Sequence, residues 1–490
     1  MSSLPPDQIR RLAEVIAREI MAGGMPAIRS ADRSSESRGD SLSGPPVGLG
    51  DGIYASLDDA VAAARVAYGA LGAVGLEKRK EIIEAMRVAM REVARPLAEM
   101  AQQETGLGRA DDKVLKNLLV TNKTPGPEVL EPEAISGDKG LVLMEPAPFG
   151  VIGAITPVTN PSSTIICNSI AMVSAGNAVV FNPHPNAKRV SAGTVRLLNR
   201  AIVKAGGPPN VLCCMAEPTI ESANALMKHP RIRLVVVTGG GAVVAAAMNS
   251  GKRAICAGPG NPPAVVDQTA EIEKAGKDII FGHSFDNNVI CTDEKEVIAV
   301  DSITDKLKAV MKANGAYELP AQDLPRLEKV IFEKGAGPRG HAVVNRKFVG
   351  KNASVILAEL GISAGPEVRT VLVEVSNEHP LIWTEQMMPV LPITRVKTAG
   401  EAIELGLAAE GANYHTATMH SRDIVNLSEM AHRCNCSIFV KNGPNLAGLG
   451  YGGEGYTSFT IASPTGEGLT GPRQFSRWRR CTIVENFRIT

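Results

Sequence analysis

The stretch Leu234-Val-Val-Val-Thr238-Gly239-Gly240-Gly241, followed by the helix-forming residues 242–249, decides the fold class. A β-branched run without polar alternation is typical of a strand that is buried on both faces of a parallel sheet. The glycine turn and the helix after it provide free N–H groups and a positive dipole end, which bind anions. On the residues alone, an anion site and a plain strand–helix connection remain equally good interpretations.

Strands and helices alternate on both sides of this stretch. We predict helices over 57–73, 77–105 and 110–123, followed by two series of strands with helices between them. The first series is Leu141–Glu145, Val151–Ile155, Ala178–Phe181, Val211–Met215, Leu234–Val237 and Ala264–Asp267. The second series is Val297–Val300, Thr370–Val375, Val390–Val396, His415–Met419 and Ser437–Val440. This alternation predicts an α/β fold of two doubly wound parallel domains in tandem.

The composition excludes several classes of partner. The 52 Lys and Arg residues almost cancel the 51 Asp and Glu residues, so we expect no nucleic acid and no anionic membrane as partner. Residues 146–187 carry no charge, but six prolines interrupt them, which argues against a membrane span. The eight cysteines form no C-x-x-C pair and no zinc-like set with histidine. These features predict a reduced, cytoplasmic protein without a metal site.

One cysteine is a candidate nucleophile. Cys291 follows Asn287-Asn288-Val289-Ile290 in a polar loop between a helical stretch and a strand, where a side chain is available for chemistry. Most of the other cysteines lie in or beside expected buried elements. Cys256, near a loop, is the main rival.

Both ends of the chain differ from the middle. Residues 1–22 form an amphipathic helix pattern, and residues 23–50 are a polar Gly/Ser/Pro linker. A helix docked on its own core is one interpretation, and a helix that binds a partner's groove is the one we favour. Residues 476–490 end the chain as a strand, which we expect to add to another sheet edge, such as that of a neighbouring subunit.

A second glycine pattern carries less weight. Gly448–Gly453 fits G-x-G-x-x-G but lacks the strand before it and the helix after it that a dinucleotide fingerprint needs. We therefore interpret it as a loop lining a substrate funnel.

Over about residues 50–490 the sequence resembles the CoA-acylating branch of the aldehyde dehydrogenase superfamily, and in particular the propionaldehyde dehydrogenases of propanediol-utilising bacterial microcompartments. The segments that carry the resemblance, in chain order, are Ile155-Thr-Pro-Val-Thr-Asn160-Pro, Phe181-Asn-Pro-His-Pro185, Thr238-Gly-Gly-Gly241, Gly258-Pro-Gly-Asn-Pro-Pro263, Asn288-Val-Ile-Cys291, Thr384-Glu-Gln-Met-Met-Pro389 and Ala462-Ser-Pro-Thr-Gly-Glu-Gly-Leu469.

The resemblance implies a domain arrangement. Residues 1–22 would be an encapsulation-type helix, 23–50 a linker and 51–265 an NAD- and CoA-binding domain. An oligomerisation flap would interrupt that domain at about 126–143. Residues 266–445 would form the catalytic domain, and 446–490 would return to the cofactor domain and end in an oligomerisation strand.

The resemblance also implies residue roles. Cys291 falls where the family has its nucleophile, Asn160 where a side-chain amide binds the oxyanion, and Glu385 where the nicotinamide ribose is held. The NAD positions are Thr156, Pro157, Asn182, Pro183, His184, Thr238, Gly239, Gly240, Gly241 and Gly258.

One departure from the hydrolytic relatives predicts the reaction. Their general-base glutamate is replaced here by Cys256-Ala257, just before Gly258. Without that base a thioacyl-enzyme awaits a better nucleophile than water, and the CoA thiol supplies its own thiolate. We therefore expect a homotetrameric, NAD-dependent enzyme that converts propanal to propionyl-CoA inside a bacterial microcompartment, bound to shell proteins through residues 1–22. An acetaldehyde-specific enzyme, a hydrolytic enzyme and a non-catalytic shell scaffold are the alternatives.

Overall fold

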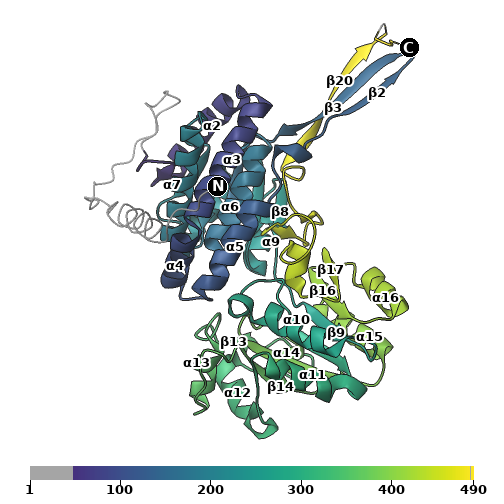
Figure 1. Cartoon of the computed structure of the whole chain (residues 1–490). Helices are drawn as coiled ribbons and strands as arrows, with labels where there is room; N and C mark the ends of the chain where they lie inside the picture. The colour runs from purple at the N-terminus through teal and green to yellow at the C-terminus, as the bar shows by residue number, and fades with distance from the viewer. Residues whose placement is uncertain (1–47, 486, 490) are drawn as a thin grey trace, which may run out of the picture.

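The computed structural model describes residues 48–485 and 487–489, so the expected helix 1–22 and nearly all of the linker lie outside the described residues. Two parallel sheets, each between layers of helices, lie one above the other in Figure 1, and a narrow antiparallel sheet projects from the upper one. Among the described residues, no helix combines the length and apolar character needed to cross a membrane.

The first sheet has six parallel strands in the order β1-β6-β5-β4-β7-β8. Their bounds are β1 Ile53–Tyr54, β4 Val151–Thr156, β5 Ala178–Pro183, β6 Leu212–Met215, β7 Leu234–Thr238 and β8 Ala254–Ala257. Its helices are α2 Leu57–Gly72, α3 Leu76–Glu92, α4 Ala94–Thr105, α5 Ala110–Lys123, α6 Pro161–Ser174, α7 Lys188–Lys204, α8 Ile220–Lys228 and α9 Gly241–Met248. Every residue of β4, β5 and α6 is buried, which explains why this part of the sequence carries no charge.

The second sheet has seven parallel strands in the order β11-β14-β15-β10-β9-β16-β17. The strands are β9 Pro263–Val266, β10 Glu296–Val300, β11 Ala316–Glu318, β14 Thr370–Glu374, β15 Val390–Val396, β16 Thr416–His420 and β17 Ile438–Lys441. The helices are α10 Ile272–Ser284, α11 Asp301–Ala313, α12 Leu324–Ile331, α13 Ala353–Glu359, α14 Pro380–Trp383, α15 Ala399–Glu410 and α16 Ile424–Cys434. The predicted α/β fold class is confirmed.

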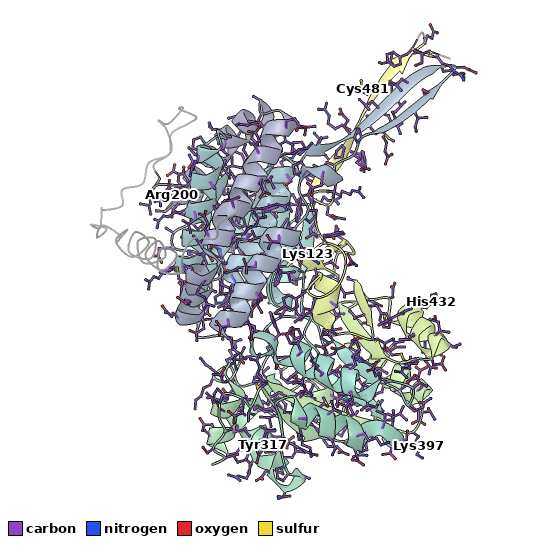
Figure 2. The ribbon with its side chains drawn as sticks, viewed as in Figure 1. Lys123, Arg200, Tyr317, Lys397, His432 and Cys481 are labelled. Atoms are coloured by element: carbon purple, nitrogen blue, oxygen red, sulfur yellow. The ribbon has the colours of Figure 1, made fainter. Side chains whose placement is uncertain are left out.

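Three strands form the projecting sheet, in the antiparallel order β2-β3-β20 (Figure 1). They are β2 Glu133–Gly137, β3 Gly140–Pro148 and β20 Ser476–Val484. The chain's last strand thus pairs with its own β3, along nine residue pairs from Ser476–Pro148 to Val484–Gly140. Figure 2 places the exposed Cys481 on this arm.

The structure corrects three details of the sequence prediction. Leu141–Glu145 is a strand, but it lies in the antiparallel arm rather than in the first parallel sheet. Ala264–Asp267 was assigned to the first series, whereas β9 lies inside the second sheet, between β10 and β16. The single helix expected over 77–105 is two helices, because Val93 leaves the helical conformation at φ −105° and ψ 12°. Strands β1, β2 and β8 were missed, since two to five residues carry too little periodic signal.

Candidate active site

The residues predicted to bind the dinucleotide follow four neighbouring strands. Thr156 ends β4 and pairs with Pro183 at the end of β5, while Thr238 ends β7 and pairs with Ala257 at the end of β8. All four strands are parallel, so their carboxyl ends share one edge of the sheet, which is where open α/β sheets bind ligands. Gly239–Gly241 and Gly258 continue from the same ends. The structure therefore brings together the predicted segments from Thr156 to Gly258 at one edge.

The turn after β7 fits an anionic cofactor group. Gly240 is the N-cap of α9 and its helix has no side-chain cap, so the first N–H groups are left for a ligand. A Cβ on Gly240 or Gly241 would meet no atom within 4 Å, so open space lies in front of the turn. The buried Thr156 hydroxyl at the same edge has no hydrogen-bond partner. The unpaired Thr156 hydroxyl beside the uncapped N-terminus of α9 fits the anionic phosphate groups of a dinucleotide.

Asn182 and His184 use their side chains locally. The Asn182 Oδ1 accepts a hydrogen bond from Ser222 Oγ at 2.6 Å, and its side chain is buried against the start of α8. His184 Nδ1 accepts from the backbone N–H of Asn186 at 3.1 Å. Both residues thus shape the edge of the sheet through these contacts.

Cys291 lies in a turn between the short helix η3 Phe285–Asn288 and strand β10. As a residue Cys291 is partly exposed, whereas its rival Cys256 is fully buried within β8. Gly260 marks where the site residues converge: its N–H donates to Glu385 Oε1 at 3.4 Å. A Cβ on Gly260 would lie 2.8 Å from His415 Cγ and 3.1 Å from the Cys291 carbonyl oxygen. The Cys291 backbone carbonyl, the Glu385 carboxylate and the His415 ring therefore meet around a glycine.

The family and the relatives agree with this geometry. The aldehyde dehydrogenase family model matches residues 50–461. The chain belongs to the aldehyde dehydrogenase family. The acetylating acetaldehyde dehydrogenase of Escherichia coli (strain K12) is 51% identical over 89% of this chain and 93% of its own length. The CoA-propanoylating propanal dehydrogenase of Salmonella typhimurium is 44% identical over 90% and 94%.

Solved structures of similar dehydrogenases show the same fold. The Rhodopseudomonas palustris propionaldehyde dehydrogenase, with bound CoA and an acylated cysteine, matches with a TM-score of 0.87 and 47% identity over 90% of this chain and 100% of that one. An engineered glycolyl-CoA reductase with bound NADP+ has a TM-score of 0.87 and 46% identity over 90% and 99%. The enzyme from the Clostridium phytofermentans fucose utilisation microcompartment has a TM-score of 0.86 and 44% identity over 90% and 100%. The resemblance to CoA-acylating aldehyde dehydrogenases is thereby confirmed.

Burial controls the ionisation of this dehydrogenase's candidate nucleophile. Burial first, and the negative charge of Glu385 second, raise the pKa of the Cys291 thiol to about 12. Burial also raises the pKa of Glu385, while it lowers the pKa of His415 to about 4. His415 is therefore a neutral imidazole at pH 7. Its Nδ1 contacts Thr416 Oγ1 at 2.8 Å, and its buried Nε2 has no partner.

A buried lysine holds the loop that carries Cys291. The Lys295 ammonium donates to Asn288 O at 3.0 Å, Asn288 Oδ1 at 2.7 Å and Ile290 O at 3.0 Å, which uses all three of its protons. All three acceptors are neutral, and within the described residues no carboxylate lies within salt-bridge distance of it. Its positive charge acts on Cys291 and Glu385, in the direction that favours their ionised forms.

Asn160 lies at the turn between β4 and α6, where a second buried cluster holds it. Its Oδ1 accepts from Lys116 Nζ at 2.6 Å. Lys116 and Lys113 both pair with the carboxylate of Asp286, which precedes the Cys291 turn. Burial lowers the pKa of Lys113 to about 8, against the opposing charge of Asp286.

Sequence reasoning missed several of these residues, namely Lys113, Lys116, Asp286, Lys295 and His415. The run Asp293-Glu294-Lys295-Glu296 was a usable signal. Charged residues leading directly into a β-strand are unexpected, and the structure buries all four side chains completely. Lys113 and Lys116, three apart on one helix, were a second signal, because that spacing places both on the same face.

The Gly448–Gly453 segment was predicted as a loop, but the short helix η5 Asn445–Leu449 includes its first two residues, and only the remainder is loop. Lys123, at the end of α5 and labelled in Figure 2, holds this loop, because its Nζ donates to Gly450 O at 2.6 Å and Gly453 O at 2.9 Å. In the described part of the chain, no group of three or more His, Cys, Asp or Glu residues could hold a metal ion.

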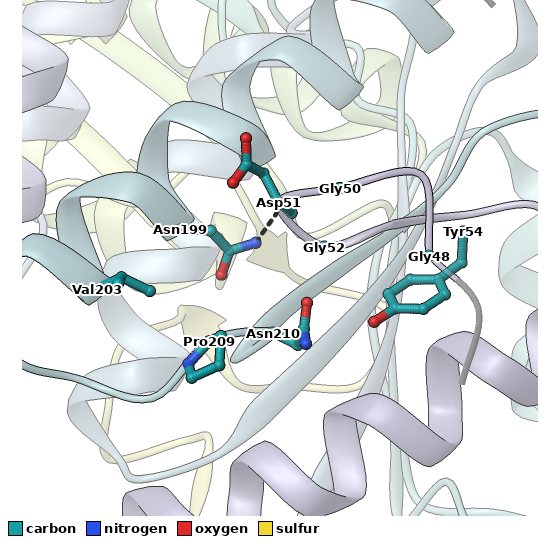
Figure 3. Close-up of a pocket in the computed structure, with 9 residues that line it drawn as sticks. All are labelled: Gly48, Gly50, Asp51, Gly52, Tyr54, Asn199, Val203, Pro209 and Asn210. Atoms are coloured by element: carbon teal, nitrogen blue, oxygen red, sulfur yellow. Dashed lines mark hydrogen bonds between the residues drawn. The ribbon is translucent and has the colours of Figure 1, made fainter. Parts of the chain in front are cut away.

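A pocket of about 290 Å³ lies elsewhere in the domain that contains the first sheet (Figure 3). Its wall includes Asp51, whose carbonyl oxygen accepts from Asn199 Nδ2 at 2.8 Å, together with Tyr54 and Asn210. Residues 50–52 and Asn210 precede strands β1 and β6, so the pocket opens at the amino ends of the strands. It is therefore at the opposite edge of the sheet from the predicted dinucleotide site.

Proposed function

We propose that this chain is an NAD-dependent, CoA-acylating aldehyde dehydrogenase that oxidises a short aliphatic aldehyde, propanal, to its acyl-CoA. One observation carries the proposal: the partly exposed Cys291 shares the space around Gly260 with Glu385 and a neutral His415. Relatives that bind CoA or NADP+ support the choice of cosubstrates.

The first half of the reaction needs a proton acceptor. With a pKa of about 12, Cys291 is a thiol at neutral pH, so its proton must leave as it attacks the aldehyde carbonyl. The unpaired Nε2 of His415 is suited to accept it. The backbone N–H of Cys291 and the Asn160 amide stabilise the oxyanion of the thiohemiacetal. The Thr238–Gly241 turn would hold the phosphates of NAD+ and Glu385 its ribose, and the nicotinamide would then supply the hydride acceptor.

The second half transfers the acyl group. Oxidation leaves a thioester on Cys291, which the CoA thiol attacks, so that one thioester replaces another. A hydrolytic outcome would need a base to activate water. Position 257 holds a buried alanine and position 256 a buried cysteine, whose pKa burial raises to about 11. The site therefore favours thiol over water.

Acetaldehyde is the second candidate substrate. The acetaldehyde enzyme of Escherichia coli is 51% identical to this chain, whereas the Salmonella propanal enzyme is 44% identical. One methylene is worth about 1–3 kcal/mol in an apolar pocket, so the two substrates should differ by about 10–200-fold in kcat/KM.

Absorbance at the NADH band tests the proposal. Full turnover is expected only with aldehyde, NAD+ and CoA together, and kcat/KM should be higher for propanal than for acetaldehyde. Turnover without CoA at a similar rate would indicate a hydrolytic enzyme, and no turnover with any aldehyde would indicate a scaffold. A higher kcat/KM for acetaldehyde would leave the acylating function intact and change the substrate.

We also propose that the projecting arm assembles a homo-oligomer, two dimers forming a tetramer. Trp478, Val484 and Ile135 are 56%, 71% and 63% exposed on it, although each is large and apolar. A second copy would bury this surface. Light scattering should give a tetramer for the wild type and a smaller species after Trp478→Glu.

The remaining proposal concerns residues 1–22, which we expect to bind microcompartment shell proteins. The resemblance of the Clostridium phytofermentans structure, which comes from such a compartment, supports this. Deletion of residues 1–47 should leave turnover unchanged and abolish co-sedimentation with shell proteins. Loss of activity in that variant would assign the segment to the enzyme's own core.

A further inference from the structure

Asn160 does not use its side chain as its position in the helix suggests. It is the N-cap residue of α6, a place where an asparagine Oδ1 ordinarily accepts a backbone N–H of the first turn. No such bond is present here. Instead, Oδ1 accepts from the ammonium of Lys116, on the neighbouring helix α5, at 2.6 Å. The first turn of α6 therefore has no side-chain cap, and the Asn160 amide oxygen binds Lys116 instead.

The contact fixes which end of the amide faces the site. The amide oxygen and nitrogen of asparagine have nearly the same shape, so packing alone does not choose between them. An ammonium can only donate, and therefore it selects Oδ1 and directs Nδ2 away from itself. One Nδ2 proton reaches Thr159 Oγ1 at 3.2 Å, and the other is left for a ligand. The positive charge of the Lys116 ammonium beside Oδ1 also polarises the amide, which makes Nδ2 a stronger donor.

Lys116 is itself held by Asp286, a residue that lies close to Cys291 in the chain. Its side chain is 2% exposed and also pairs with the fully buried carboxylate of Asp286. Asp286 Oδ1 accepts from the Arg109 N–H at 2.6 Å, and Oδ2 accepts from Lys113 Nζ at 2.8 Å. Asp286 belongs to η3, just before Cys291. The Lys116 ammonium therefore links Asn160, the proposed oxyanion donor, to the loop that carries the nucleophile.

We propose that Lys116 is a positioning residue, which orients and polarises the Asn160 amide so that Nδ2 stabilises the oxyanion formed at Cys291. The inference rests on the proposed function, in which Asn160 binds the oxyanion. It also gives the ion cluster of Lys113, Lys116 and Asp286 a second role, which is to hold Asn160 in a fixed position relative to the Cys291 loop.

Lys113 provides a matched control for Lys116. The two lysines lie on the same helix, are 3% and 2% exposed, and pair with the same carboxylate. Only Lys116 contacts the Asn160 side chain, because Lys113 Nζ instead reaches Thr159 O at 3.3 Å. Each substitution by methionine leaves Asp286 with one lysine and the Arg109 N–H, so neither variant leaves an unpaired buried charge. The pair therefore separates loss of the cluster from loss of the amide contact.

The measurement is the burst of NADH formed before CoA is added. Lys116→Met should slow it at least about 10-fold, toward the ~10²-fold typical of losing an oxyanion donor, while Lys113→Met slows it less than about 3-fold. Both should lower the melting temperature similarly, and NAD+ affinity should be unchanged. In an Asn160→Ala background, Lys116→Met should cause no further slowing, because the amide it orients is gone.

Three results would overturn the proposal: a wild-type burst rate in Lys116→Met, equal slowing by both lysine variants, or multiplying losses in the double variant. If Lys116→Met does not fold, Lys116→Gln serves, since it keeps a polar group but lacks the charge and one atom of reach. It should still slow the burst about 10-fold or more, and an undiminished rate counts against the proposal. The wild-type requirement for aldehyde, NAD+ and CoA tests the proposed function separately.

Discussion

The edge of the first sheet that we propose binds the dinucleotide and the loop that carries Cys291 are built with different chemistry. The edge at Thr238–Gly241 offers backbone N–H groups, open space and no charged side chain of its own. The Cys291 loop is held by buried charges, chiefly Lys295 and the pairs that Asp286 makes. A cofactor that must bind and leave suits a surface of backbone groups, whereas a nucleophile that must stay in register suits rigid, costly ion contacts. Variants of the two regions should therefore fail in different ways.

The largest expected effect is at Cys291. Cys291→Ala should lower acyl-CoA formation at least about 10³-fold, because it removes the thiol that carries the acyl group in the proposed reaction. Cys256→Ala is the control and should retain most of the activity. Mass spectrometry of enzyme incubated with aldehyde and NAD+ but no CoA should find the acyl group on Cys291. An acyl group on Cys256 would contradict the assignment.

Lys295→Met should have the next largest effect and should impair both stability and reactivity. Three acceptors lose their donor, at about 1–3 kcal/mol for each buried group left unpaired. Because the ammonium favours the Cys291 thiolate, its removal should raise the thiol pKa, seen as a shift to higher pH in the rate of iodoacetamide labelling. The exposed Lys397→Met variant should change neither quantity. An unshifted labelling profile in a folded Lys295→Met enzyme would show that the charge does not act on the thiol.

Two glycine variants sharpen the comparison between the regions. Gly260→Ala places a methyl 2.8 Å from His415 Cγ, so the neighbours must move, and we expect about a 10-fold fall in the labelling rate of Cys291. Gly240→Ala meets nothing within 4 Å in the protein, so it should leave labelling unchanged and weaken NAD+ binding several-fold. Fluorescence titration with the dinucleotide measures the second effect. Equal effects of both variants on labelling would show that the two regions are not independent.

At Glu294 the expected change is in the pH dependence of stability rather than in activity. Burial raises the pKa of this carboxyl to about 8, whereas the unfolded value is near 4.5. Between those two values the unfolded chain has lost a proton that the folded chain keeps, so this group makes the free energy of unfolding fall as pH rises, by ~1.4 kcal/mol per pKa unit. Glu294→Gln should remove that fall while keeping the acceptor for the Asn445 N–H. Chemical denaturation at pH 5 and pH 8 measures it, and an unchanged slope in the variant would place the effect elsewhere.

How much the sequence could predict follows the same division between regions. Strand, glycine turn and helix are local patterns, so β7, its turn and α9 were predictable residue by residue. The Lys116–Asn160 and Lys113–Asp286 contacts join residues that are 44 and 173 positions apart, and no local pattern encodes them. Similarly, Leu141–Glu145 looks like any other strand, and its antiparallel partners are set by the arm's turn and by the far end of the chain.

The pairing of β20 with β3 bears on how the enzyme is made. The Arg480 side chain contacts Met144 across 336 positions of sequence, so β3 leaves the ribosome long before its outer partner exists. Until β20 is synthesised, one side of β3 has no neighbour, and an open strand edge is prone to pair with other chains. A chain that stops before β20 would keep that edge indefinitely. Synthesis of β20 thus acts as a checkpoint, because only a chain that contains it has a complete three-stranded arm.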